Sequence, residues 1–252
     1  MIAELEARAF AAWPAAEVEL LGGWRLRATA GVTRRANSAW TAGDAGELGP
    51  AIAQTEAFYA ARALPAAFQL CPLSPPALDG ELAARGYGAE GAVSIQTVEL
   101  AALASRTPPG VETHVAAELD GAWFELAAHR GRYAATPEVF RGLVGRIGRR
   151  AGFALARLDG APAATALGVC EAGWLGVFAM ATLPEFRRRG AATALLDALR
   201  SWGESLGAAR AYLQVERDNA EALALYARDG FREAYGYHYR VSAPARASTR
   251  SA

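Results

Sequence analysis

The sequence predicts an α+β protein built from two similar halves, and three observations lead to this prediction. Short strand-like apolar runs alternate along the chain with longer runs that have helical spacing. A polar segment rich in helix breakers, Ser105 to Gly110, interrupts the chain near its middle. On both sides of this segment, a helix that ends in a glycine and an aromatic residue leads into a strand.

The repeated pattern covers four elements in each half. A helix precedes a strand, a second helix ends in glycine plus an aromatic residue, and a last strand follows. The corresponding ranges are 48–59 and 195–206, 67–71 and 211–215, 82–87 and 225–231, and 92–100 and 234–241. We therefore expect two tandem domains, and the predicted parts are a first copy at 1–105, a linker at 106–110, a second copy at 111–241 and a disordered tail at 242–252.

Composition limits the possible functions. The 252 residues are 52% hydrophobic, which is enough for substantial cores, and the formal net charge is zero. Balanced charge favours neither nucleic acid nor an anionic membrane as a partner. All 26 basic residues are arginines, which excludes a Schiff-base lysine or a phosphate-loop lysine. The two cysteines, Cys71 and Cys170, lie among apolar residues, and we expect buried thiols rather than a disulfide.

The N-terminal residues do not resemble a targeting signal. Acidic residues stand at Glu4 and Glu6, where a signal peptide needs basic ones, and no apolar run approaches the length of a membrane span. We expect a cytoplasmic protein that is a monomer or a weak dimer.

The strongest local signal is a turn between a buried strand, 174–180, and an amphipathic helix. Three arginines precede three small residues there, in the run Arg187-Arg188-Arg189-Gly190-Ala191-Ala192. Small residues allow a ligand to approach the backbone, and no Ser, Thr, Asp or Asn within the run caps the free amides of the first helical turn. The amides, the helix dipole and the arginines together predict a pyrophosphate site, although an arginine run is more often only a solvated face.

This run resembles the R/Q-x-x-G-x-G/A signature of the GCN5-related N-acetyltransferase superfamily, which binds the pyrophosphate of acetyl-coenzyme A (acetyl-CoA). A second match follows in the family's N-x-x-A-x-x-L-Y-x-x-x-G-F arrangement, at Asn219, Ala222, Leu225, Tyr226, Gly230 and Phe231. The resemblance is close over 111–241 and loose over the first hundred residues. It implies tandem acetyltransferase-like domains, each with a mixed, mostly antiparallel sheet flanked by helices.

The resemblance also implies the activity and its residues. We expect an acyl-CoA-dependent N-acyltransferase in which an amine, from a small molecule or a protein amino terminus, attacks acetyl-CoA directly in a ternary complex. Tyr226 is expected to protonate the departing thiolate, and no metal is expected. The cofactor-binding residues implied are Val177, Phe178, Ala179 and Met180 through their backbone, Arg187, Arg188, Arg189, Gly190, Ala191, Ala192 and Thr193 at the turn, and Asn219.

Several residues keep alternative interpretations. Asn219 is equally a helix N-cap, and Tyr226 has the alternative of a core aromatic. The general base stays unassigned because the strand 174–180 contains no carboxylate. The flanking or nearby candidates are Glu171, Glu216, His129 and His238, of which the histidines are more often packing or surface residues.

The first copy lacks the features of a cofactor site. Its corresponding corner, 42–47, carries Asp44 and Glu47, which should stabilise the helix start themselves and repel a pyrophosphate. Leu82 or Ala83 stands where the second copy has its tyrosine. We therefore interpret the first copy as a degenerate scaffold. Two rival functions remain, an acyl-CoA sensor without catalysis and a nucleic-acid module whose arginines include 146, 149 and 150.

Overall fold

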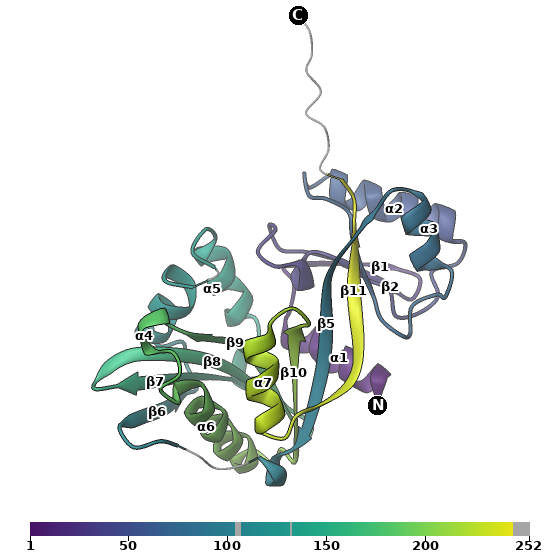
Figure 1. Ribbon diagram of the computed structural model, residues 1–252. Coiled ribbons are helices and arrows are strands. Elements are labelled where there is room, and N and C mark those ends of the chain that lie inside the picture. Colours follow the sequence, from purple (N-terminus) through teal and green to yellow (C-terminus); the bar gives the residue numbers. More distant parts are fainter. Residues whose placement is uncertain (104–106, 132, 244–252) are drawn as a thin grey trace, which may run out of the picture. The chain divides into compact units, whose positions relative to one another are not determined.

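The computed structural model describes residues 1–103, 107–131 and 133–243 (Figure 1). The chain forms two compact units, and each combines stretches that are distant in sequence. Unit 1 consists of Met1–Pro14 and Val93–Gly236, and unit 2 consists of Ala15–Ala92 with the segment that begins at Tyr237.

Unit 1 contains the predicted second copy as far as Gly236. Its strands have the order β6-β7-β8-β9-β10-β5, and every neighbouring pair is antiparallel except β9 and β10. Its elements are α1 (Ile2–Ala12), β5 (Gly88–Glu99, from Val93), η2 (Leu100–Ala102), β6 (Val111–Ala116), α4 (Gly121–Phe124), the π-helix η3 (Glu125–His129), α5 (Pro137–Gly145), η4 (Gly148–Arg150), β7 (Ala151–Leu158), β8 (Ala161–Glu171), β9 (Trp174–Thr182), η5 (Pro184–Phe186), α6 (Ala191–Ser205), β10 (Arg210–Glu216), α7 (Ala220–Arg228) and β11 (Arg232–Val241, to Gly236).

Helices cover both faces of the unit 1 sheet. On one face, α6 packs its predicted apolar stripe against β7 and β8. Trp202 of this helix lies close to Gly152 and Gly168, and a Cβ on either glycine would be under 3 Å from the indole ring. On the other face, Trp13 at the end of α1 stacks on Phe178 of β9, with ring centroids 5.7 Å apart. Figure 1 shows α7 in front of β10 and α1 behind it.

Unit 2 repeats this arrangement on a smaller scale. Its strands have the order β1-β2-β3-β4-β11, antiparallel except between β3 and β4. Helices α2 and α3 supply Ile52, Leu78 and Leu82 to one apolar core that also contains Trp24 and Phe68. The elements are β1 (Glu17–Leu21), β2 (Trp24–Ala28), η1 (Arg34–Ala36), β3 (Ala39–Trp40), α2 (Leu48–Ala60), β4 (Ala67–Leu70), α3 (Leu78–Ala84), the start of β5 and the end of β11.

Each half of the chain contributes one strand to the unit formed mainly by the other half. In unit 1, β5 from the first half of the chain pairs with β10, with Ser94 opposite Val215. In unit 2, β11 from the second half pairs with β4, with His238 opposite Leu70. The units therefore do not divide at the expected linker, 106–110, because pairing between distant strands is invisible to local periodicity. Arg106 of that linker lies outside the described residues.

The predicted fold class is confirmed, with a mixed, mostly antiparallel sheet flanked by helices. Most of the predicted tail, from residue 244 on, lies outside the described residues. Its first residue is fixed, since Ser242 exchanges hydrogen bonds with the backbone of Ala66 at 2.9 and 3.0 Å. Both cysteines are free thiols, as expected, although Cys170 is only partly buried.

Candidate functional site

Strands β9 and β10 stop pairing before either of them ends. Their parallel ladder runs from Trp174 opposite Arg210 to Val177 opposite Leu213, and beyond these residues the two strands no longer pair with each other. Beyond Val177, the edge of β9 that faces β10 is therefore not used in the ladder between them. Backbone groups released in this way need other partners, so this edge is suited to an extended polar ligand.

A β-bulge lies where the two strands separate. On β8, Leu167 is opposite Phe178, but Thr165 is opposite Ala181, so Ala179 and Met180 together face a single residue. Ala179 has a φ of +46°, a left-handed conformation that a non-glycine residue rarely adopts. Such a bulge bends the strand and leaves an extra residue outside the regular ladder.

Tyr226 reaches this bulge from helix α7. Its hydroxyl donates to Met180 Sδ at 3.5 Å, and its ring packs edge-on against Phe231 with the centroids 5.8 Å apart. The side chain is only 8% exposed, and this burial raises the pKa of Tyr226 to about 12. The structure therefore places a protonated phenol beside two of the predicted backbone contacts.

The predicted pyrophosphate turn forms the start of helix α6. Arg188 and Gly190 both have left-handed backbones, with φ of +58° and +83°. Gly190 is the N-cap, and no side-chain hydrogen bond caps the helix. The three arginines of the turn are exposed, and Arg189 forms a surface ion pair with Asp159 at 2.8 Å. An uncapped helix N-terminus with flanking arginines is the arrangement that the sequence predicted.

A proline side chain fills part of the space at this turn, and the sequence did not predict this contact. Pro108 lies over Gly190, and a Cβ on the glycine would be 2.3 Å from Pro108 Cγ. The preceding Thr107 donates a hydrogen bond to Asp197 of α6 at 2.8 Å. Glycine at position 190 is thus required by the proline packing as well as by the positive φ.

The structure shows Asn219 in its helix-capping role. Its Oδ1 accepts a hydrogen bond from the backbone of Ala222 at 3.1 Å, at the first turn of α7. A contact between its amide and the cofactor stays a prediction.

The candidates for the general base lie in different places. Glu171, the last residue of β8, forms an ion pair with Arg150 at 2.8 Å and lies opposite Trp174, at the end of β9 that is away from the bulge. Glu216 ends β10, at the same end of the strands as Met180. His129 is exposed on η3, edge-on to Phe124. His238 belongs to unit 2.

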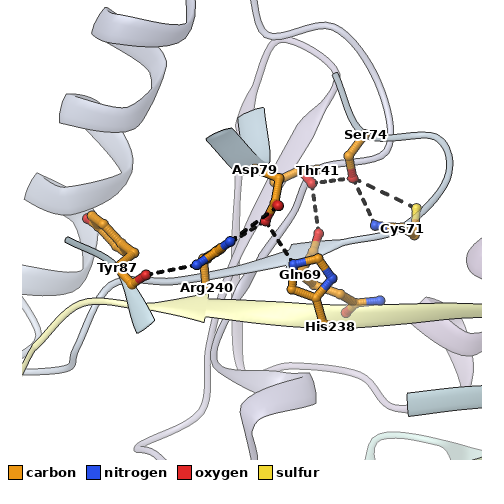
Figure 2. A network of polar contacts seen from close by, with 8 residues as sticks. All are labelled: Thr41, Gln69, Cys71, Ser74, Asp79, Tyr87, His238 and Arg240. Carbon is orange, nitrogen blue, oxygen red and sulfur yellow. Dashed lines mark hydrogen bonds and ion pairs between the residues drawn. The ribbon is translucent and has the colours of Figure 1, made fainter. Parts of the chain in front are cut away.

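In unit 2, the place equivalent to the strand gap is filled by side chains. The ladder of β3 and β4 stops at Trp40 opposite Gln69. Directly beyond it, the Thr41 hydroxyl donates to the carbonyl of Gln69 at 2.7 Å and is hydrogen-bonded to Ser74 Oγ at 2.7 Å (Figure 2). Thr41 is completely buried. Leu82, one of the two residues aligned with the tyrosine in the sequence repeat, is also completely buried.

The acidic corner of unit 2 lies directly before helix α2, whose N-cap residue is Glu47. Neither carboxylate caps helix α2, since Asp44 accepts a hydrogen bond from Gly46 within the loop and Glu47 makes no side-chain cap.

His238 has a structural contact in unit 2. Its Nε2 is 2.9 Å from Asp79 Oδ1, and the same carboxylate accepts hydrogen bonds from Arg240 at 2.8 and 3.2 Å (Figure 2). The Arg240 hydrogen bond is the main reason why the pKa of Asp79 is lowered to about 2. This group joins α3 to β11.

Comparison with known proteins agrees with this geometry. A family model described as "Probable histone acetyltransferase Rv0428c C-terminal" matches residues 1–240. The chain belongs to this acetyltransferase family, within the GCN5-related superfamily. The acetyltransferase is 31% identical over 255 residues to the "Uncharacterized N-acetyltransferase YobR" of Bacillus subtilis, a match that covers 95% of this chain and 98% of the relative.

Solved structures show the same fold. A GCN5-related N-acetyltransferase from Kribbella flavida matches with a TM-score of 0.69 and 19% identity, over 96% of this acetyltransferase and 92% of that chain. A tandem protein of the superfamily from the clavulanic acid biosynthesis pathway matches with a TM-score of 0.62 and 14% identity, over 77% and 69%. Among the described residues, none of the helices is long and apolar enough to cross a membrane.

Proposed function

We propose that this acetyltransferase uses acetyl-CoA as its donor and an amine as its acceptor, and that unit 1 carries the reaction. The observation that supports this most is the position of Tyr226, whose buried, protonated hydroxyl is directed at the β9 bulge. There it hydrogen-bonds to the sulfur of Met180, a weak acceptor that a thioester sulfur would readily replace.

The proposed binding of acetyl-CoA follows the elements of the site. The pyrophosphate lies at the amides of Gly190, Ala191, Ala192 and Thr193, with the turn arginines supplying positive charge. The pantetheine arm then runs along the edge of β9 that faces β10, at residues 177–180, with Asn219 on its other side. This path brings the thioester to the hydroxyl of Tyr226.

The proposed chemistry is a single transfer in a ternary complex. The amine nitrogen forms a bond to the thioester carbonyl carbon, and the bond from carbon to sulfur breaks. Tyr226 gives its proton to the departing thiolate, while the amine loses one proton to solvent. Backbone N–H groups of the bulge would stabilise the developing oxyanion. Small amines and protein amino groups both fit this chemistry, and the description of the matching family names histones.

The test is thiol release from acetyl-CoA with a panel of small amines and peptides with free amino termini, together with calorimetry of acetyl-CoA binding. We expect binding in the absence of an amine and thiol release that depends on an amine. Tight binding with no thiol release for any acceptor would favour the alternative, a non-catalytic acyl-CoA sensor. No binding would contradict both functions.

A further inference from the structure

Thr165 on β8 presents a buried hydroxyl that needs explanation. The side chain is 0% exposed, and Thr165 Oγ1 has no hydrogen-bond partner within the part of the chain that the structure describes. Leaving a buried hydroxyl unpaired costs about 1–3 kcal/mol, so such groups in folded proteins usually bind a water molecule or serve a functional site.

The position of Thr165 relates it to the candidate site. Thr165 pairs with Ala181, and this is the first regular pair after the β9 bulge. Thr165 therefore lies next to the irregular backbone of Ala179 and Met180. A bulge leaves backbone groups outside the ladder. A water molecule bound to Thr165 would need such backbone groups as its further partners, because a buried water makes about two to four hydrogen bonds.

The hydroxyl also lies on a defined face of the sheet. Ala164 and Ala166, its neighbours on β8, belong to the core formed with α6, and Tyr226 belongs to that same core. Side chains alternate along a strand, so Thr165 faces the other side. Leu167 shares this side with its cross-strand partner Phe153, whose ring packs edge-on against Trp123 of α4.

An acceptor would approach the thioester from this other side, where buried aromatic side chains of α1 and α4 pack on the sheet. The pyrophosphate turn opens α6, and Tyr226 lies on α7, so the proposed donor occupies the face that these two helices cover. An amine that attacks the thioester must approach from a direction that the donor leaves free. The element over β8 on this face includes the π-helix η3, a type of irregularity that is frequent at functional sites.

We propose that Thr165 is a positioning residue for the acceptor. Its hydroxyl binds a water molecule beside the bulge, and this water accepts a hydrogen bond from the attacking amine and directs its nitrogen toward the thioester. The inference rests on the proposed function. In the transfer, nitrogen binds the carbonyl carbon, the bond to sulfur breaks, and the amine proton leaves through this water to solvent. Tyr226 protonates the sulfur and recovers its proton from solvent.

The test compares Thr165→Val with Thr165→Ser. Valine has nearly the same shape but no hydroxyl, and no described protein group depends on this hydroxyl for a hydrogen bond, so we expect T165V to stay folded with an unfolding temperature close to that of the unsubstituted protein. With the amine panel, we expect kcat of T165V to fall at least tenfold while KM for acetyl-CoA stays within twofold. T165S should restore kcat to within threefold of the unsubstituted enzyme.

Thr55→Val is the matched control. Thr55 is also completely buried, but its hydroxyl donates to the Ala51 carbonyl at 2.9 Å in helix α2 of unit 2. T55V should lower the unfolding temperature and leave kcat unchanged. An active unsubstituted enzyme together with T165V of equal kcat would overturn this inference alone. An unsubstituted protein that releases no thiol with any amine would overturn the proposed function, and this inference with it.

Discussion

At the scale of single residues, Tyr226 combines two properties that a general acid needs. It is held in one place by Met180 and Phe231, and its burial keeps the phenol protonated. Positioned acids typically contribute 10²–10⁴-fold to a rate. We expect Tyr226→Phe to lower kcat by about 100-fold and to leave KM for acetyl-CoA within twofold, measured by steady-state thiol release.

The pH dependence follows from the same burial. The pKa of Tyr226 is raised to about 12, so its acid form persists well above neutral pH. Loss of this proton should therefore not reduce kcat between pH 7 and 10. A Phe variant with the activity of the unsubstituted enzyme over this range would remove Tyr226 from its proposed role. If Tyr226→Phe lowered the affinity for acetyl-CoA by the same factor as kcat, the result would instead indicate a role in binding.

The arginines of the turn predict a charge effect on binding. Arg187 is exposed, and it stands at the first position of the cofactor signature. Reversal to Glu should weaken acetyl-CoA binding by about tenfold at low ionic strength, with a smaller effect in high salt because exposed charges are screened. Calorimetry at two salt concentrations checks this. Asp159→Asn is the control, since it releases Arg189 from its ion pair and should not weaken binding.

At the scale of elements, the turn before α6 depends on its glycine. Gly190→Ala would place a Cβ in a left-handed backbone, 2.3 Å from Pro108 Cγ. We expect a loss of about 2 kcal/mol in the free energy of unfolding, from the backbone strain and the displaced proline. Denaturant titration measures the loss. Gly207→Ala is a control with a similar φ of +82° and nothing within 4 Å of its Cβ, so it should cost less.

Local elements were largely predictable from sequence because each carries its own periodicity. One apolar stripe predicts a helix over 195–206, and the helix in the structure begins earlier, at Ala191, and ends at Ser205. The bulge was not predictable, because a positive φ at Ala179 is imposed by pairing with β8 and leaves no trace in residue type. The role proposed for Thr165 is not predictable from sequence for a related reason. One hydroxyl within an alanine-rich strand gives no signal until its missing partner is known.

At the scale of the whole molecule, the exchange of strands changes what counts as a folding unit. The sequence divides the chain near 106–110, yet β10 has its neighbour in β5, and β4 has its neighbour in β11. Register and partner choice depend on contacts between distant segments, which a repeated local pattern does not specify. The repeat therefore predicts the helices and strands of each half correctly. It places the boundary between the halves at 106–110, whereas the two compact units divide after Pro14, Ala92 and Gly236.

This exchange predicts that the two halves do not fold independently. A fragment 107–252 lacks β5 and so leaves the edge of β10 unpaired, while a fragment 1–103 lacks the partner of β4. Exposed strand edges favour aggregation, so we expect each fragment alone to aggregate or to lack cooperative unfolding. Co-expressed fragments should instead assemble into a soluble complex that unfolds cooperatively, as measured by circular dichroism. A fragment 107–252 that folds cooperatively and binds acetyl-CoA by itself would show that the exchanged strand is dispensable, and the sequence boundary would then be the functional one.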